Sequence, residues 1–142
     1  MAKVAVVYWS GTGNTEKMSE YVKDGITGTG AEADVYAASE FNAKRASEYA
    51  KIAFGCPSMG NEVLEEDEFE PMFRSLEGQL GGKTLALFGS YGWGDGEWMR
   101  TWESRCKGLG ANLVSEGVIA NEVPDNAAAD ECRKLGTALA SS

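Results

Sequence analysis

The chain has 142 residues, of which 22 are acidic and 13 basic, so its net charge is −9 at pH 7 and its pI is about 4.5. Such a surface repels phosphates, which argues against a nucleic-acid partner and favours partner proteins with basic docking faces. Histidine is absent, which excludes histidine-based triads, histidine metal sites and histidine general bases.

The composition is that of an ordinary globular protein. With 43% hydrophobic residues and no internal repeat or linker, the chain is expected to form a single domain over residues 1–142. No signal peptide and no apolar stretch of membrane length is recognisable, so we expect a cytoplasmic protein with no membrane partner. Cys56, Cys106 and Cys132 are odd in number and contain no C-x-x-C pair, which argues against disulfides, zinc and iron–sulfur ligation.

Strand and helix patterns alternate from the start of the chain. Residues 4–8 form a Val-rich run of strand length, and apolar residues then recur at helical spacing over residues 18–26. Residues 33–37 alternate weakly, as in a strand at the edge of a sheet. Residues 42–49 predict a short helical turn or loop, and residues 52–56 predict a buried strand that ends at a proline.

The second half continues the same alternation. A long loop over residues 57–67 precedes a helix whose apolar positions run from 69 to 80. A strand, a helix, a fifth strand and a last helix follow: residues 84–88, 99–109, 113–119 and 128–139. The pattern predicts an α/β fold with a five-stranded parallel sheet, strand order 2-1-3-4-5, covered by helices on both faces. Ligands of such folds bind beyond the carboxyl ends of the strands.

The loop after the first strand places small polar residues at a helix N-terminus: Ser10, Gly11, Thr12, Gly13, Asn14 and Thr15. The first amides of a helix lack intrahelical partners and lie at its positive end, so this loop is suited to a phosphate. No Gly-Lys-[Ser/Thr] follows, and Glu16 occupies the third glycine position of the dinucleotide fingerprint. A Walker A loop and a dinucleotide site are therefore excluded. Neutral donors favour one terminal phosphate, whereas the simpler alternative is an N-cap turn.

The loops after the third and fourth strands hold residues suited to a flat ring. Trp93 lies between Gly92 and Gly94, so no neighbour in its own loop buries the indole, and a planar partner would stack on it. Met59 offers a polarisable thioether for the other face of such a ring. Either side chain could instead fold onto the core. A phosphate loop together with a stacking indole suggests a planar ring that carries a monophosphate, as FMN does.

Over essentially its whole length, the chain resembles the flavodoxins of the short clostridial type. Three segments carry the resemblance: YWSGTGNTE at residues 8–16, MGNEVLEE at 59–66 and GSYGWGDG at 89–96. The resemblance implies a flavodoxin-like three-layer sandwich that binds FMN non-covalently. It also implies a low-potential one-electron carrier, cycling between semiquinone and hydroquinone, that serves redox partner proteins and has no substrate turnover of its own.

The resemblance assigns a role to each loop. It implies that residues 10–15 hold the FMN phosphate and that Met59 and Trp93 flank the isoalloxazine. The Gly60 carbonyl is implied as the partner of flavin N5, and Glu62 is implied near N3. The remaining implied contacts come from neighbouring positions of the same loops: Ser58, Asn61, Ser90, Tyr91, Gly92 and Gly94.

Other proteins with this topology fit less well. A phosphoryl-receiver domain needs an Asp where the third strand here ends in Gly55-Cys56-Pro57, and a related acid phosphatase needs C-x₅-R after the first strand. An FMN-dependent NAD(P)H:quinone oxidoreductase shares the fold and the cofactor. It stays open as the alternative function, although the chain leaves little length for a substrate pocket.

An acidic run lies next to the expected flavin edge: Glu62, Glu65, Glu66, Asp67, Glu68 and Glu70. Carboxylates at a helix start complement the helix dipole. The same carboxylates could form a docking rim for basic redox partners. We expect a monomer.

Overall fold

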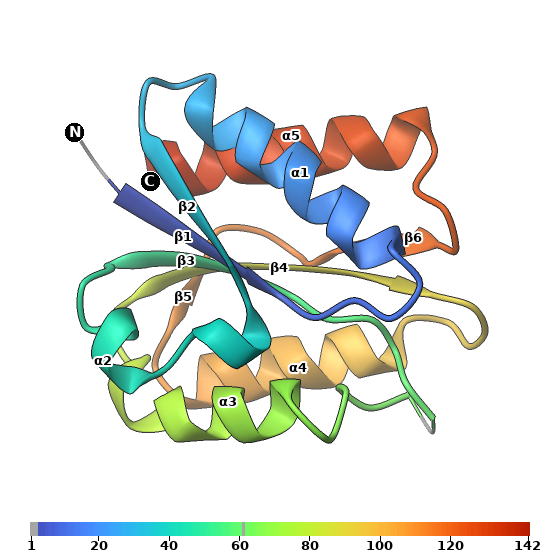
Figure 1. Ribbon diagram of the computed structural model, residues 1–142, viewed down its shortest axis with the longest axis horizontal. Helices are drawn as coiled ribbons and strands as arrows, with labels where there is room; N and C mark the ends of the chain where they lie inside the picture. The colour runs from blue at the N-terminus through green and yellow to red at the C-terminus, as the bar shows by residue number, and fades with distance from the viewer. Residues whose placement is uncertain (1–2, 61) are drawn as a thin grey trace.

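The computed structural model describes residues 3–60 and 62–142. A parallel sheet forms the middle of three layers (Figure 1). Helices α1 (Asn14–Thr27) and α5 (Asn126–Ser141) cover one face, and α3 (Phe69–Leu76) and α4 (Glu97–Gly108) cover the other. The strand order is β2-β1-β3-β4-β5, with β6 also paired to β4. The predicted fold class and the predicted order 2-1-3-4-5 are confirmed.

The strands lie close to their predicted positions: β1 (Lys3–Tyr8), β2 (Glu32–Ala37), β3 (Lys51–Gly55), β4 (Thr84–Tyr91), β5 (Asn112–Leu113) and β6 (Val118–Asn121). Strand β2 lies at one edge of the sheet, as its weak alternation predicted. The predicted turn at 42–49 contains the single-turn helix α2 (Ala43–Ala46), preceded by the 3₁₀ turn η1 (Ala38–Glu40). The helix predicted to run to residue 80 ends at Leu76 and continues as the 3₁₀ turn η2 (Glu77–Gln79).

Two sequence-based boundaries were wrong. The fifth strand is not continuous over 113–119, because β5 pairs with the start of β4 and β6 pairs with its end, and residues 114–117 bulge between them. Strand β4 does not stop at Phe88, because the register with β6 continues through Tyr91. Gly89 permits this extension, since a β-carbon there would overlap the carbonyl of Cys56, the residue that follows β3. Residues 89–91 therefore belong to the sheet and not to a loop.

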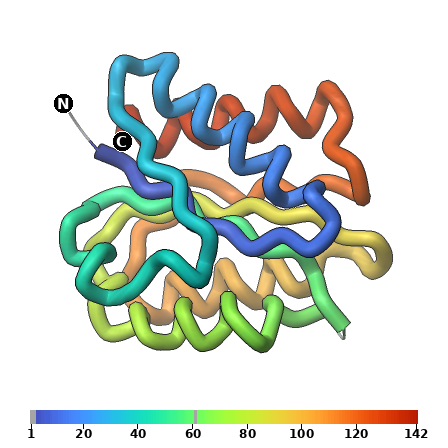
Figure 2. Tube along the Cα trace, viewed as in Figure 1, coloured from blue at the N-terminus to red at the C-terminus, as the bar shows by residue number. Residues whose placement is uncertain are grey.

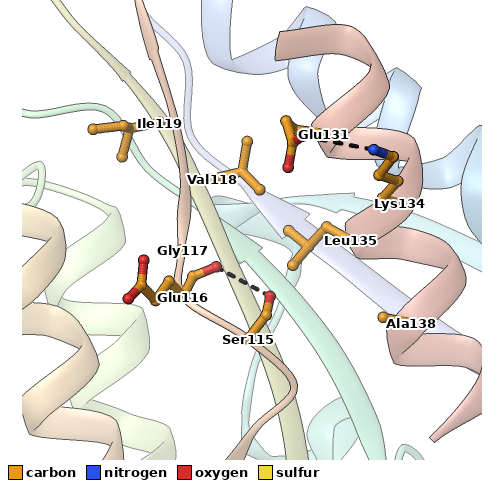
Figure 3. Close-up of a pocket in the computed structure, with 9 residues that line it drawn as sticks. All are labelled: Ser115, Glu116, Gly117, Val118, Ile119, Glu131, Lys134, Leu135 and Ala138. Atoms are coloured by element: carbon orange, nitrogen blue, oxygen red, sulfur yellow. Dashed lines mark hydrogen bonds and ion pairs between the residues drawn. The ribbon is translucent and has the colours of Figure 1, made fainter. Parts of the chain in front are cut away.

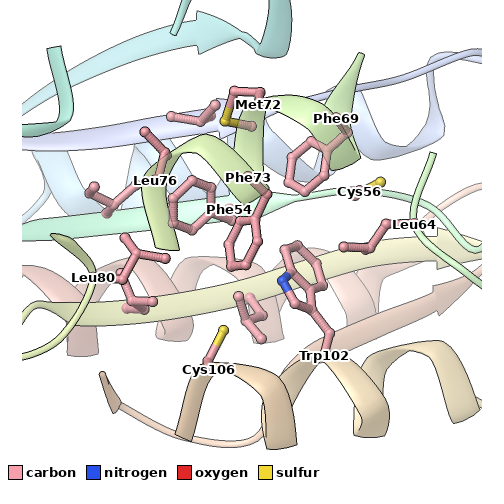
Figure 4. Packing of buried hydrophobic residues seen from close by; sticks show 14 of the residues in the cluster. Phe54, Cys56, Leu64, Phe69, Met72, Phe73, Leu76, Leu80, Trp102 and Cys106 are labelled. Carbon is pink, nitrogen blue, oxygen red and sulfur yellow. The ribbon is translucent and has the colours of Figure 1, made fainter. Parts of the chain in front are cut away.

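The sheet has a different core on each face, because side chains of a strand alternate between faces. Val4 and Val6 of β1 face the aliphatic layer under α1 and α5. The opposite layer is aromatic, with Phe54, Phe73 and Trp102 among its largest buried side chains (Figure 4). The rings of Phe54 and Phe73 lie 5.1 Å apart in an edge-to-face arrangement, which is a favourable geometry for aromatic pairs. This layer holds α3 and α4 against the sheet.

Candidate functional site

Four loops meet at the carboxyl end of the sheet, at the right-hand end of the molecule in Figure 2. Between them lies a hollow of about 420 Å³, lined by Trp9, Gly11, Thr12, Asn14, Pro57, Ser58, Met59, Ser90, Tyr91, Gly92, Glu122 and Val123. The loops after β1, β3 and β4 line it, at the carboxyl ends of the strands where ligands of such folds were expected to bind, and the loop after β6 joins them. The volume lies within the range of about 300–1,000 Å³ that is typical of small-molecule sites.

The loop before α1 presents free backbone amides. Ser10 Oγ accepts hydrogen bonds from the amides of Gly13, at 3.1 Å, and Glu16, at 3.3 Å. Gly13 has a φ of 93°, a left-handed conformation that glycine adopts without strain. Within the described residues, no acceptor is bonded to the amides of Gly11, Thr12, Asn14 and Thr15. Four unpaired donors at the positive end of a 14-residue helix form a site for an anion.

Thr15 does not line the hollow, although it was predicted to belong to the site. Its hydroxyl lies 2.9 Å from Ser90 Oγ and accepts the Ser90 amide at 3.3 Å, and both residues are buried. The Thr15 side chain therefore joins the start of α1 to the end of β4. Its backbone amide, and not its hydroxyl, is available to a ligand.

The segment after β3 contains a tight hairpin. Met59 and Val63 exchange two backbone hydrogen bonds, with N–O distances of 2.9 and 3.0 Å. Gly60 and Glu62 both have left-handed backbones, with φ of 50° and 55°. Asn61, which was also predicted to contact the cofactor, lies outside the described residues. The predicted long loop is thus folded back on itself.

The Glu62 carboxylate lies at the N-terminus of α4. Its Oε1 accepts the Glu97 amide at 3.2 Å, where the helix dipole favours negative charge. Gly94 has a φ of 88°, a left-handed conformation that favours glycine, and a β-carbon there would also force this carboxylate to move. Neither Glu62 nor Gly94 lines the hollow. The implied approach of Glu62 to flavin N3 stays a prediction.

The two side chains predicted to flank a flat ring are both accessible. Trp93 is 60% exposed and Met59 is 37% exposed, so neither is folded into the core. Met59 lines the hollow, whereas Trp93 stands outside its lining on the neighbouring loop. Ser10, Gly13 and Gly60 also lie outside the lining.

Sequence reasoning missed four residues of the lining: Trp9, Pro57, Glu122 and Val123. Glu122 and Val123 follow β6, and the Glu122 amide donates to the Tyr91 carbonyl at 2.8 Å. Glu122 and Val123 could have been predicted from their position after the fifth strand, where ligands of such folds bind. That strand was predicted to end at residue 119, so the two residues were not assigned to the site. Trp9 directly follows the end of β1, and Pro57 lies two residues beyond the end of β3.

Beneath the hairpin, Glu65 is an internal carboxylate. It is 5% exposed and accepts the amides of Asp67, Glu68 and Phe69, each at 2.8 Å, at the start of α3. Burial alone would raise the pKa of this carboxyl, but the three backbone donors outweigh burial and hold the pKa below its ordinary value. Glu65 is therefore a helix cap that fixes the base of the hairpin.

The cysteines offer no redox chemistry at this site. All three are free and buried, and burial raises the pKa of each thiol, to about 12 for Cys106 and Cys132. Among the residues that the structure describes, no group of three Cys, Asp or Glu side chains is placed to hold a metal ion. In the same part of the chain, no helix combines the length and the apolarity needed to cross a membrane.

A second hollow, of about 540 Å³, lies between α5 and the bulge that separates β5 from β6 (Figure 3). Glu131 and Lys134 form an ion pair at 3.9 Å beside it, and Ser115 and Glu116 come from the bulge. None of the predicted site residues lines it. Its polar groups are already paired with one another or exposed to solvent, so it adds nothing to the site at the carboxyl end of the sheet.

Comparison with known proteins agrees with this geometry. Residues 6–136 match the family model described as flavodoxin. The chain is 44% identical to a flavodoxin from Clostridium beijerinckii over 95% of this chain and 97% of that protein. It is 43% identical to a flavodoxin from Megasphaera elsdenii over 96% and 98% of the two chains. The solution structure of the two-electron reduced M. elsdenii protein superposes with a TM-score of 0.91, over 98% of this chain and 99% of that one. The chain belongs to the flavodoxin family, whose members bind FMN and carry electrons.

Proposed function

We propose that the chain holds one FMN non-covalently at the carboxyl end of the sheet and carries electrons between partner proteins. The single observation that supports this best is the set of four unpaired amides before α1, three of which belong to residues that line the 420 Å³ hollow. A doubly charged phosphate accepts several such donors at once. Because the donors of the loop are neutral, the site suits one terminal phosphate.

The proposed contacts divide among the loops. The amides of residues 11, 12, 14 and 15 bind the phosphate, with Ser10, Thr12 and Gly13 shaping the loop around it. Met59 and Trp93 approach the ring from its two sides. The backbone at Ser58, Gly60 and Ser90 to Gly94 faces the polar edge of the ring, together with Asn61, Glu62 and Tyr91. For the described residues, these assignments rest on the position of each residue at the hollow or on the loops that surround it, and that of Asn61 rests on the resemblance alone.

The flavin supplies the redox chemistry, since it accepts electrons one at a time. The chain contributes the environment. A net charge of −9 and a hollow walled by Trp9, Met59 and Tyr91 both disfavour additional negative charge on the ring. We therefore propose that the protein works at low potential.

The proposed partners are redox proteins with basic faces. Glu66 and Asp67 are exposed beside the hairpin, where they would steer such a partner toward the ring. We propose that the protein acts as a monomer and has no substrate turnover of its own. The alternative, an NAD(P)H:quinone oxidoreductase, predicts that the purified protein with FMN consumes NADH when quinone is added.

A titration of the apoprotein with FMN and with riboflavin tests the phosphate site. FMN should bind far more tightly, because riboflavin lacks the phosphate. Thr12→Val removes one hydroxyl from the loop without changing the volume of the side chain. This variant should weaken FMN binding and leave riboflavin binding unchanged. Equal affinity of the wild-type protein for the two ligands would contradict the proposed site.

A further inference from the structure

Trp9 connects the phosphate loop to the acidic segment after the hairpin. Its backbone amide donates to the Gly55 carbonyl at 3.0 Å, which fixes the residue at the end of β1. Its ring lies against Gly11, where a β-carbon would come within 3.0 Å of the indole. Its Nε1 donates to Glu68 Oε1 at 3.3 Å, across a separation of 59 residues. The indole is therefore bonded to Glu68 through its Nε1, and its ring lies against Gly11 of the loop.

Glu68 is itself fixed to the fold. Its backbone amide donates to the Glu65 carboxylate at 2.8 Å, and Glu65 is the buried cap of α3. The backbone of Glu68 is thus fixed to the start of α3, and this limits where its side chain can lie. Its hydrogen bond to Trp9 transmits that position to the indole.

We propose that Glu68 is a positioning residue for phosphate binding: it orients the Trp9 indole, which supports the Gly11 backbone so that the loop amides converge. This inference rests on the proposed phosphate site. Without the bond to Glu68, the indole is free to rotate, and the exposed backbone at Gly11 and Thr12 loses the surface that it packs against. The loop would then have to be ordered by the phosphate itself, at the expense of affinity.

Whether FMN affinity falls or rises when the Glu68 carboxylate is removed separates a positioning role from simple charge repulsion. A carboxylate near the site repels the dianionic phosphate, so removing an acidic side chain should tighten FMN binding if charge alone matters. Removing a positioning carboxylate should weaken it. Glu66 is the matched control, because it is an exposed carboxylate of the same segment with no hydrogen bond to the loop among the described residues.

The experiment measures the dissociation constants of FMN and riboflavin for the wild-type protein and for variants. Glu68→Ala and Trp9→Phe should each weaken FMN binding by about 3- to 10-fold, the fold-change expected for one hydrogen bond. Riboflavin affinity should stay unchanged in Glu68→Ala, whose side chain does not line the hollow. The double variant should bind FMN no more weakly than the weaker of the two single variants, because both remove the same bond.

Glu68→Gln keeps an acceptor oxygen for the indole and should retain the wild-type preference for FMN. Glu66→Ala should leave FMN binding unchanged or make it tighter.

The outcomes that overturn the proposal are distinct. If Glu68→Ala tightens FMN binding as Glu66→Ala does, Glu68 acts through its charge alone. If the two single variants add in the double variant, they do not share one interaction. Should Glu68→Ala fail to fold, Trp9→Phe tests the same bond from the indole side, and an unchanged ratio of the two affinities there refutes the proposal. If the wild-type protein already binds riboflavin as tightly as FMN, the proposed phosphate site itself is wrong.

Discussion

Trp93 has an unusual environment for so large an apolar side chain. It is 60% exposed, and it lies between glycines on the loop that leads into α4. The other three tryptophans are half-buried or buried, and Trp98 and Trp102 belong to the core. An indole left in water loses the free energy that burial would provide, and we propose that bound FMN covers it.

We therefore expect Trp93→Ala to weaken FMN binding by about tenfold or more, since aromatic stacking adds about 0.5–1.5 kcal/mol beyond area burial. The fluorescence of bound FMN should rise, because a stacked indole quenches the flavin. Trp93→Phe retains a ring and should lie between the wild-type protein and Trp93→Ala. Fluorescence titration measures both quantities, and unchanged values would mean that Trp93 does not contact the ring.

The Glu65 carboxylate is buried and has a structural role, whereas the sequence suggested a role in docking. The sequence placed it in an acidic rim, but its side chain is turned inward and satisfies three amides at the start of α3. Its pKa is lowered by those amides, so folding favours its ionised form. The resulting stabilisation is present above the ordinary pKa of a glutamate and is lost as the pH falls through the lowered pKa.

Glu65→Gln should accordingly destabilise the protein by about 1–3 kcal/mol at pH 7, because backbone donors lose a charged acceptor and a buried amide gains no partner. The difference from the wild-type protein should shrink at a pH below the ordinary pKa of a glutamate, and it should vanish below the lowered pKa of the native carboxyl. Urea unfolding at both pH values measures this change. The exposed Glu66→Gln serves as the control and should have little effect at either pH. A penalty that is independent of pH would show that the charge of Glu65 does not stabilise the fold.

At the scale of elements, α1 and α5 cross closely over one face of the sheet (Figure 1). Gly25 of α1 faces the Arg133 carbonyl of α5, and Gly136 of α5 faces the Val22 carbonyl of α1. A β-carbon at either glycine would overlap backbone that neither helix can easily move. Since α1 begins at the phosphate loop, this crossing also sets where the loop lies relative to the sheet.

Gly136→Ala should destabilise the protein by about 1–3 kcal/mol, the usual cost of overpacking, despite the better helix propensity of alanine. Gly108→Ala is the matched control, because that glycine lies in α4 with open space around its α-carbon. The control should be neutral or stabilising by up to about 1 kcal/mol. Chemical denaturation compares the two variants, and equal stabilities would contradict the close crossing.

At the scale of the whole molecule, the acidic rim is smaller than its sequence suggests. Glu65 is buried, and Glu70 is paired with Arg105 at 2.7 Å and with Arg74 at 3.5 Å. Glu66, Asp67 and Glu68 remain exposed next to the hollow. A basic partner would therefore be guided by a short stretch at one end of the molecule, added to the general charge of −9.

Electron transfer to a basic c-type cytochrome should consequently slow as salt rises, because charges are screened over about 8–10 Å near physiological ionic strength. Neutralising Glu66 and Asp67 together, as Glu66→Gln with Asp67→Asn, should slow the reaction at low salt and have little effect at high salt. Glu32→Gln together with Glu48→Gln is the control for net charge, because both exposed residues lie at the opposite end of the sheet, at the start of β2 and just before β3. Stopped-flow rates over a range of salt concentrations test this, and a flat salt profile would assign the rim to solubility alone.

The sequence by itself determined the alternation of strands and helices, the parallel sheet and the position of the small polar loop before α1, which we propose binds the phosphate. These features depend on periodicity and on residue types within a few positions of one another, such as Ser10 to Thr15, so they can be read locally. The three segments that resemble flavodoxins predicted the family for the same reason. The exposure of Trp93 also followed from its two glycine neighbours.

Only the tertiary structure decided which polar groups face the hollow and which support it. The Thr15–Ser90 contact joins residues 75 positions apart, and the Trp9–Glu68 bond spans 59. The inward turn of Glu65 and the entry of Glu122 into the site likewise depend on how α3 and β6 pack against the sheet. No local pattern specifies such partners, because each hydrogen bond forms only after β1, β3, β4 and β6 have aligned and brought their carboxyl ends together.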